Sequence, residues 1–339
     1  MANETNTNKF DLVLVDGSSY LYRAFYALPA LTNSKGQQTG AIYGVMNMIK
    51  KLLKEFPSIY FAVVFDSPGK TFRDELFSQY KATRAPTPPE IISQFPDLNN
   101  LLKCWGLPVI QIEGVEADDV IASFVGIAKK QKMNVLISTG DKDLAQLVEP
   151  GVTLINTMSN TYLDREGVIA KFELPPELIQ DYLALIGDKV DNIPGVPKVG
   201  PKTAVKWLKD YGSVEKLIEN ADTIKGAVGE SLRNYLDQLA LSYQLTSLKT
   251  DVNFDFAITD LKPKQPDYST LTTLLKKLEF KTWLKELAEN ADQTTHLSSK
   301  NYNHYKMVTQ NDDFLDLLRQ LENTNYFVFD TETDSLDVL

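Results

Sequence analysis

The feature that most constrains the fold is a series of acidic residues placed where buried strands should end. The runs LVLVD (12–16), FAVVFD (61–66) and VLISTGD (135–141) each consist of four to six apolar or small residues and then a carboxylate. In a parallel sheet, the carboxyl ends of the strands fall along one edge, where ligands bind. Because strand and helix patterns alternate along residues 10–138, we predict an α/β fold with a mostly parallel sheet and an acidic edge.

The sequence pattern predicts four strands and a series of helices. The predicted strands cover residues 10–16, 59–66, 107–112 and 133–138. The predicted helices begin after Gly17 and cover residues 89–104 (with a kink or break at Pro96), 117–131 and 143–148. Residues 178–250 lack clear strand patterns and are expected to form a helical subdomain.

Nine carboxylates are candidates for one site. They are Asp16, Asp66, Glu116, Asp118, Asp119, Asp141, Asp143, Asp188 and Asp191. Two unit charges 4 Å apart repel by about 4 kcal/mol at an effective dielectric near 20, so gathered carboxylates predict bound cations. Hard oxygen ligands favour Mg²⁺ or Mn²⁺, and two such ions about 4 Å apart can hydrolyse phosphodiesters. Individually, these acids could also be turn residues, helix caps or partners of a helix dipole; their joint occurrence favours a metal site.

A basic and aromatic segment, GKTFRDELFSQYKATRAPTPPEII, separates Asp66 from Glu116. Arg73, Tyr80, Lys81 and Arg84 stand in it at roughly helical spacing, which predicts a shared face, and the prolines that follow end the helix. A solvated surface helix would explain the composition equally well. The position between two strand-end carboxylates favours a functional role.

The second strong signal is IPGVPKVGPKTAVKWL, residues 193–208. Gly195 and Gly200 bracket a tight hairpin, and a proline suits the first turn of the next helix. Backbone N–H groups at such a helix N-terminus bind phosphate, and Lys198, Lys202 and Lys206 add positive charge on successive turns. The plainer alternative is a helix–turn–helix corner without a ligand.

Composition places few limits on function. The net charge of −10 by itself opposes a nucleic-acid partner, but nine negative charges belong to the proposed site, and residues 189–209 hold five lysines against one acid. The single cysteine, Cys104, cannot form an internal disulfide. No secretory signal or apolar run of about 18 residues is visible. We therefore expect a cytoplasmic protein without a membrane partner, and a monomer, since no coiled-coil heptads occur.

The end of the chain has a different pattern. Residues 289–304 are polar, and after them we expect a strand at 305–310, a helix at 312–323 and a strand at 325–337 that ends in carboxylates. One helix and two strands bury too little core for a domain, so we expect a fragment of a longer protein. The expected regions are an α/β core (1–175, with an arch at about 70–90), a helical subdomain (176–290), a linker (291–304) and a truncated domain (305–339).

The ordered runs VDGSSYLYRAFYALP, FDSPGKTFRDELFSQYKATRAPTPPE, EGVEADDVIAS, STGDKDLAQLV and LIGDKVDNIPGVPKVGPKTA make residues 1 to about 290 resemble the 5′-nuclease domains of bacterial DNA polymerase I. These domains are relatives of the flap endonucleases, with a PIN-like fold and a helix-hairpin-helix subdomain. The run FVFDTETDSL resembles the first motif of the adjoining 3′–5′ exonuclease. There Asp330 and Glu332 would be metal ligands.

The resemblance implies divalent-metal-dependent cleavage of DNA near 5′ ends, at flaps, nicks and single-strand/double-strand junctions, with RNA primers as a further candidate substrate. It divides the nine acids into two groups of metal ligands. The first group is Asp16, Asp66, Glu116, Asp118 and Asp119, and the second is Asp141, Asp143, Asp188 and Asp191. Because Asp119 would be a ligand of the first group, Asp119→Asn is expected to abolish cleavage. Lys81 and Arg84 would stabilise charge on the reacting phosphate, and Tyr80 would stack on a base. Arg23 and Arg73 would contact the flanking phosphates. The hairpin would grip duplex phosphates and hold K⁺ through backbone carbonyls, and residues 35–46 would lie near the duplex junction.

Three other functions stay open at this point. A PIN-like ribonuclease shares the carboxylate-edged sheet, although such domains are usually shorter and lack the glycine-lysine hairpin. A catalytically silent DNA-binding module would be favoured by lost ligands, and none of the nine is missing. A small-molecule phosphatase would not explain the arch and the hairpin.

Overall fold

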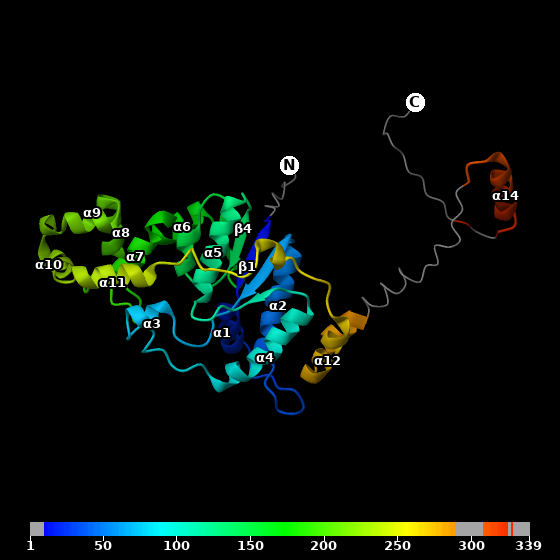
Figure 1. Ribbon diagram of the computed structural model, residues 1–339, viewed down its shortest axis with the longest axis horizontal. Coiled ribbons are helices and arrows are strands. Elements are labelled where there is room, and N and C mark those ends of the chain that lie inside the picture. The colour runs from blue at the N-terminus through cyan, green and yellow to red at the C-terminus, as the bar shows by residue number, and fades with distance from the viewer. Residues whose placement is uncertain (1–9, 289–307, 325–326, 328–339) are drawn as a thin grey trace. The chain divides into compact units, whose positions relative to one another are not determined.

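A computed structural model describes residues 10–288, 308–324 and 327 of the chain. The chain divides into two compact units, residues 1–284 and 285–339. The first unit contains a central sheet with helices on both faces and a group of helices beyond one end of it (Figure 1). The predicted α/β class with a mostly parallel sheet is confirmed.

The sheet has six strands in the order β3-β2-β1-β4-β5-β6. The strands are β1 (Leu12–Asp16), β2 (Tyr60–Val64), β3 (Val109–Ile110), β4 (Val135–Ser138), β5 (Val152–Asn156) and β6 (Thr161–Leu163). All neighbouring pairs are parallel except β5 with β6. The chain moves outward from β1 to β2 and β3, then crosses to β4 on the other side of β1. The carboxyl end of β1 is therefore a topological switch point, where side chains from both halves of the sheet converge.

Both faces of the sheet are covered. Leu12 and Leu14 of β1 are fully buried in one core with α5 (Ala117–Lys130), which packs on β1, β2 and β4. Because side chains alternate along a strand, Val13 and Val15, which are also fully buried, face the opposite side. There α1 (Gly17–Ala27), α2 (Gly40–Glu55) and α4 (Pro89–Cys104) pack on one another.

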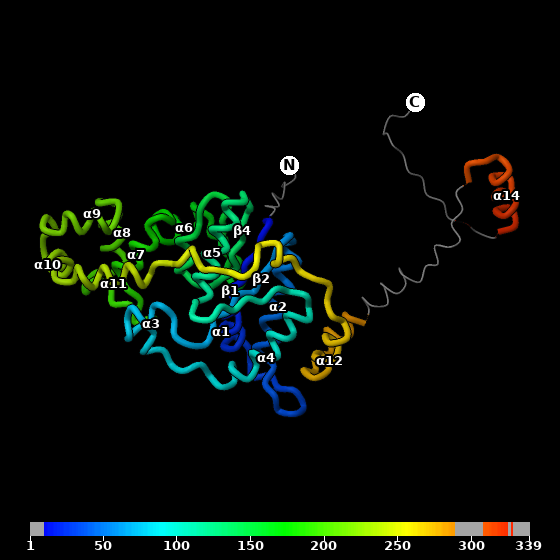
Figure 2. Tube along the Cα trace, in the orientation of Figure 1, coloured from blue at the N-terminus to red at the C-terminus, as the bar shows by residue number. Residues whose placement is uncertain are grey.

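Further helices of the first unit lie around this core or beyond one end of it. They are α3 (Phe72–Leu76), α6 (Arg165–Phe172), α7 (Ile179–Ile186), α8 (Pro201–Tyr211), α9 (Val214–Glu219), α10 (Gly226–Asn234), α11 (Leu236–Thr246) and α12 (Tyr268–Leu278). The chain trace in Figure 2 places α8 to α11 together beyond one end of the sheet, with the segment after α3 running along the same side as α4. As predicted, residues 178–250 form no strand.

Several local expectations differ from the structure. Helix α4 continues through Pro96 without a break; Pro96 and Ile92, whose carbonyl loses its helical partner, are both exposed, so water can replace the missing hydrogen bond. The helix expected at 143–148 is a 3₁₀ helix, Asp143–Leu147. Strands β5 and β6 were not predicted, although VTLIN of β5 has an ordinary strand composition.

The hairpin between α7 and α8 depends on close packing of two glycines. Gly187 ends α7 with φ +68°, and Gly195 has φ +60°. A Cβ atom on Gly195 would lie 2.5 Å from the backbone nitrogen of Gly187. Gly200, the N-cap of α8, has φ −106° and open space around its missing Cβ. Of the two glycines that bracket the predicted hairpin, only Gly195 is therefore required by backbone geometry.

The second unit contributes one described helix, α14 (Asn311–Glu322), which agrees with the helix expected at 312–323. Residues 308–310, expected to end a strand, are not in one. The rest of that expected strand and almost all of the strand at 325–337, including Asp330 and Glu332, lie outside the described residues.

We predict that Gly195→Ala lowers the free energy of unfolding by about 2 kcal/mol or more, because it combines a left-handed backbone with a clash against Gly187. Gly200→Ala is the matched control and should change stability by less than about 0.5 kcal/mol. Chemical denaturation measures both values. Equal effects of the two substitutions would contradict the packing described for the hairpin.

Candidate active site

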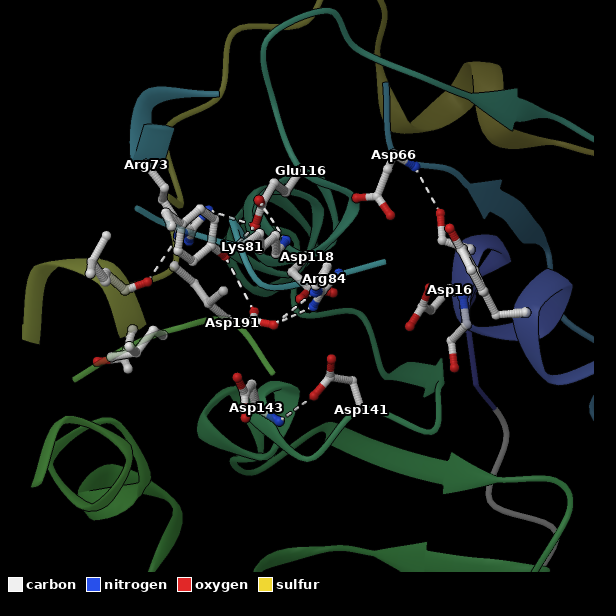
Figure 3. A pocket seen from close by; sticks show the side chains of 18 residues that line it. Asp16, Asp66, Arg73, Lys81, Arg84, Glu116, Asp118, Asp141, Asp143 and Asp191 are labelled. Atoms are coloured by element: carbon white, nitrogen blue, oxygen red, sulfur yellow. Dashed lines mark hydrogen bonds and ion pairs between the residues drawn. The ribbon is translucent and has the colours of Figure 1, made fainter. Parts of the chain in front are cut away.

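Five of the acidic residues reach the carboxyl edge of the sheet from adjacent elements. Asp16 is the last residue of β1, and Asp66 follows β2. Glu116 and Asp118 lie at the N-terminus of α5, and Asp141 follows β4. Since β1 lies between β2 and β4, the fold brings these side chains around one open space (Figure 3).

This space is a cavity of about 160 Å³, which can hold several water-sized ligands. Its acidic lining consists of Asp16, Asp66, Glu116, Asp118, Asp141, Asp143 and Asp191. Its basic and aromatic lining includes Tyr22, Arg73, Tyr80, Lys81 and Arg84. An adjoining hollow is lined by Arg23, Arg84, Lys142 and the acids Asp141, Asp143, Asp188 and Asp191. The structure thus places the acids of the second predicted group together.

Short hydrogen bonds hold the carboxylates of the first group in place. The backbone N–H of Ser19 (2.9 Å) and the hydroxyl of Thr139 (2.7 Å) donate to Asp16. The backbone N–H of Ala117 donates to Asp66 over 2.9 Å. The start of α1 and the start of α5 therefore fix two acids that come from different strands.

Burial and mutual repulsion raise the pKa of several of these acids. Burial is the largest cause for Asp16 and Asp143, and with neighbouring carboxylates it raises each pKa to about 7. Burial, followed by repulsion from Asp141, Asp16 and Asp66, raises the pKa of Asp118 well above its ordinary value. The pocket therefore lacks the positive charge that would keep all of its carboxyl groups ionised at neutral pH.

The chain supplies only part of that positive charge. Lys81 Nζ lies 2.7 Å from Glu116 Oε1, and Arg84 forms an ion pair with Asp191. Lys142 Nζ lies 2.7 Å from Asp188 Oδ2. Burial disfavours the charged form of Asp188, but the hydrogen bond and attraction from Lys142 outweigh it and lower the pKa. No ion pair to Asp16, Asp66, Asp118, Asp141 or Asp143 occurs within the described part of the chain.

The arch differs from its predicted form. Helix α3 ends at Leu76, and Lys81 has a left-handed backbone with φ +55°, so no helical face carries the four predicted side chains. Tyr80 is 5 % exposed, and its hydroxyl lies 3.2 Å from Glu116 Oε2. In this conformation the Tyr80 ring is packed inside and offers no face to a base, so base stacking by Tyr80 stays a prediction.

Two further assignments need correction. Arg73 is 2 % exposed and forms ion pairs with Asp119 (2.7 Å) and Glu116 (3.1 Å), so it does not present its guanidinium to a phosphate. Asp119 is completely buried and does not line the cavity, although its neighbour Asp118 does. Successive helical residues face different directions, which explains why the acidic pair of α5 separates.

The donor chemistry of the cavity fits divalent cations. Asp143 Oδ1 is buried and has no hydrogen-bond partner, which is costly unless something else satisfies it. All of the candidate ligands are carboxylate oxygens, the donors that Mg²⁺ and Mn²⁺ prefer. No three acids, histidines or cysteines among residues 10–288, 308–324 and 327 are already gathered as one ligand set. Bound ions would therefore have to draw the carboxylates closer together.

Sequence reasoning missed three residues that contribute to this site. Thr139 orients Asp16, and the hydroxyl of Ser18 accepts a hydrogen bond from the backbone of Asp66. Lys142 pairs with Asp188. Ser18 stands two residues after Asp16 in the motif VDGSS, and Lys142 stands between Asp141 and Asp143 in GDKD, so their closeness to predicted ligands was an available signal. The contact of Thr139 depends on the pairing of β1 with β4, which the motifs do not contain.

The predicted duplex-binding residues of the hairpin lie between α7 and α8 and on α8 itself. Lys198, Lys202 and Lys206 are exposed, as a phosphate contact requires. Arg23 is half-buried, and its guanidinium donates to Asn156 over 3.0 Å beside Gly140. A Cβ at position 140 would lie 1.9 Å from that guanidinium, so the glycine of the GDKD turn makes room for Arg23.

Two family descriptions match the chain in succession. Residues 11–173 match the N-terminal resolvase-like domain of 5′-3′ exonucleases, and residues 174–269 match their C-terminal SAM-fold domain. These ranges contain the sheet and the hairpin helices, respectively. The chain therefore belongs to the 5′-3′ exonuclease family.

Individual relatives agree with this assignment. The chain is 48 % identical over 341 residues to DNA polymerase I of Pseudomonas aeruginosa, a match that covers 96 % of this chain and 37 % of that protein. It is 44 % identical over 276 residues to the 5′-3′ exonuclease of Aquifex aeolicus, covering 81 % of this chain and 94 % of that protein. The chain thus spans about a third of the polymerase relative and nearly all of the exonuclease relative.

Solved structures confirm the fold. The T5 D15 protein co-crystallised with metal ions has a TM-score of 0.62 at 20 % identity, covering 82 % of this chain and 98 % of that one. A pseudo-enzyme-product complex of the bacteriophage T5 D15 flap endonuclease with DNA and metal ions has a TM-score of 0.60 at 21 % identity, covering 82 % of this chain and 99 % of that one. At these identities, the likeness concerns the fold. Among the helices described, none is long and apolar enough to cross a membrane.

We predict that Asp143→Asn stabilises the metal-free protein at pH 8. A carboxyl whose folded-state pKa is about 7 instead of 3.8 keeps a proton that the unfolded chain loses, so its contribution to stability is present below about pH 4 and is lost as pH rises toward 7. Asparagine imitates the neutral acid. We expect a gain of at least about 1 kcal/mol at pH 8 in EDTA and a much smaller change at pH 4.5.

Thermal unfolding at the two pH values measures this difference. The control is Asp210→Asn, an exposed acid on α8 outside the cavity, which should give similar small changes at both. A gain from Asp143→Asn that does not depend on pH would contradict the raised pKa.

Proposed function

We propose that the chain is a structure-specific 5′ nuclease that hydrolyses phosphodiester bonds of DNA at 5′ ends and flaps. The observation that carries this proposal is the ring of seven carboxylates at the carboxyl edge of the sheet, faced by the cationic arch. Membership of the 5′-3′ exonuclease family supports the reaction. The structurally similar T5 flap endonuclease complex, which contains DNA and metal ions, supports the substrate class.

We infer that two or more Mg²⁺ or Mn²⁺ ions occupy the pocket. Asp16, Asp66, Glu116 and Asp118 would hold the first, and the carboxylates of Asp141, Asp143, Asp188 and Asp191 the second, some of them through water. When bound, such ions activate water and stabilise a leaving oxygen. The uncompensated acids and the unpartnered oxygen of Asp143 support this assignment. We also propose that backbone carbonyls of the α7–α8 hairpin hold a K⁺ ion. This ion would lie near the phosphates of the duplex that the hairpin is proposed to bind.

The arch supplies the cations for the reacting phosphate. Lys81 and Arg84 already line the cavity, and each is paired with an acid that we assign to metal binding. Arg84 is exposed, and the Lys81 side chain is 28 % exposed, so both can exchange a carboxylate for a phosphate oxygen. Such an exchange would free Glu116 and Asp191 for the metals and place two positive charges where negative charge develops.

The hairpin and the helix α8 hold the duplex. Lys198, Lys202 and Lys206 would contact phosphates, which gives binding without sequence readout. Arg23, at the edge of the second hollow, would contact a phosphate near the cut. Residues 35–46, at the start of α2, would lie near the junction. RNA-primed 5′ ends are further candidate substrates.

The wider setting is also a proposal. The polymerase relative is much longer than this chain, and the motif with Asp330 and Glu332 would begin a 3′–5′ exonuclease domain. We propose a cytoplasmic monomer that acts in DNA replication and repair. A silent DNA-binding module and a PIN-like ribonuclease are the alternatives, and substrate cleavage separates them.

We predict Mg²⁺-dependent release of the flap from a 5′-labelled flap duplex, near the junction. Asp118→Asn should slow cleavage by at least about 100-fold, because it removes an uncompensated carboxylate from the cavity, while duplex binding in Ca²⁺ stays within about twofold. Asp210→Asn is the control with ordinary cleavage. Binding without cleavage by the unaltered chain would favour the silent module, and cleavage of RNA alone would favour the ribonuclease.

We predict that Lys202→Ala weakens duplex binding and reduces its salt dependence. Removing one phosphate contact should make the negative slope of log K against log salt shallower by about 1. Glu215, on the exposed surface of α9, provides the control Glu215→Ala, which should leave the slope unchanged. An unchanged slope for Lys202→Ala would remove α8 from the DNA interface.

A further inference from the structure

Arg73 uses all of its donors inside the protein. A guanidinium has five N–H groups. Nε donates to the carbonyl of Leu245 (2.9 Å), and Nη1 donates to Glu116 (3.1 Å) and Asp119 (2.7 Å). Nη2 donates to Asp119 (2.9 Å) and to the carbonyl of Ser247 (2.6 Å). No N–H group of Arg73 remains to bind a phosphate of the substrate.

Asp119 is satisfied in the same way. Oδ1 accepts from Arg73 Nη2 and from the backbone N–H of Lys249 (2.8 Å), and Oδ2 accepts from Arg73 Nη1. The residue has no exposed surface and does not line the cavity. The bidentate pair with Arg73 is the geometry in which guanidinium and carboxylate bind most strongly. Both oxygens of Asp119 are thus engaged inside the protein, and neither is exposed to a metal ion in the cavity.

The Arg73–Asp119 pair joins three segments that lie far apart in the chain. Arg73 belongs to α3 at the base of the arch, and Asp119 to the first turn of α5. The two carbonyls and the N–H of Lys249 belong to the end of α11 and the segment after it. Further along the arch, Lys81 and Arg84 form ion pairs with acids. Their own side chains are 28 % and 46 % exposed, respectively. The base of the arch is thus fixed by buried contacts, and its outer part by contacts open to water.

We propose that Arg73 and Asp119 are positioning residues of the nuclease site: their buried ion pair anchors the base of the arch to α5. The anchor holds Glu116 through Arg73 and leaves Asp118 facing the cavity. The outer arch, with Lys81 and Arg84, can then exchange its acidic partners for phosphates while its base stays in place. This inference rests on the proposed nuclease function, and it replaces direct roles for Arg73 in phosphate contact and for Asp119 in metal binding.

DNA binding tests the role of Arg73 independently of cleavage. Duplex affinity is measured in Ca²⁺ across a range of salt for Arg73→Met, Arg73→Lys and Lys202→Ala. The anchor predicts that both Arg73 variants keep the salt slope of the unaltered chain, whereas Lys202→Ala lowers it by about 1. A slope lowered by about 1 in Arg73→Met and restored in Arg73→Lys would overturn the proposal, because a lysine can replace a phosphate contact.

Cleavage tests the coupling of the pair. In single-turnover reactions we expect Arg73→Met and Asp119→Leu each to lose at least about 30-fold in rate, because each leaves a buried charge without its partner. The double variant Arg73→Met/Asp119→Leu replaces the pair by apolar groups and should cleave about tenfold faster than either single variant. Arg73→Lys, which cannot form five bonds in a fork, should be as slow as Arg73→Met.

The outcomes separate the alternatives. If Asp119 binds metal directly, the double variant is as slow as Asp119→Leu or slower, and the proposal fails. The proposal also fails if thermal unfolding shows that the double variant does not fold, because Arg73 and Asp119 would then do more than compensate each other's charge. If the unaltered chain does not cleave DNA, the proposed function is wrong, and the salt slopes alone decide whether Arg73 is an internal anchor.

Discussion

Electrostatic repulsion among carboxylates at the carboxyl edge of the sheet is the constraint on which this structure depends. The strand order places β1 between β2 and β4, so acids that are far apart in the chain are brought around one cavity. Folding alone cannot keep them all charged, as the raised pKa values of Asp16, Asp118 and Asp143 indicate. The site must therefore be completed by protons, by cationic side chains or by metal ions, and each of these makes it sensitive to its surroundings.

The cationic arch supplies positive charge to these acids both from buried and from partly exposed side chains. Arg73 compensates the buried acids Asp119 and Glu116, while Lys81 and Arg84, whose own side chains reach water, pair with Glu116 and Asp191. Breaking the Arg73–Asp119 pair would leave buried charges unpaired, whereas the partly exposed side chains of Lys81 and Arg84 can turn to water or to another anion at a smaller cost. The same electrostatic problem thus gives the arch a fixed base and an exchangeable outer part. We infer that the substrate competes with the carboxylates for the outer cations only.

Much of this arrangement could be predicted from the sequence, because apolar runs that end in acids define both the strands and the edge where the acids meet. The course of α4 through Pro96 could not, since it depends on whether a carbonyl faces water. The separation of Asp118 from Asp119 requires knowing which side of α5 faces the sheet edge. Arg73 and Tyr80 were predicted to bind DNA because positive charge and an aromatic ring are typical of that function. Arg73 is bound by the carbonyls of Leu245 and Ser247, in a segment without a motif, and Tyr80 packs on Leu245 and Ile193. These contacts between distant segments cannot be predicted from the motifs.

The turn after α7 connects the two halves of the proposed function. Asp188 and Asp191 line the second hollow, and Gly195 packs against Gly187 only a few residues later. The proposed metal ligands and the start of the proposed duplex-binding hairpin therefore share one short, closely packed turn. There the backbone N–H of Gly195 also donates to the hydroxyl of Ser242 on α11 (3.1 Å). A duplex held by Lys198 and Lys202 would be placed at a fixed spacing from the second metal group. In the proposed nuclease, this fixed spacing would let the shape of the substrate set the cleavage position.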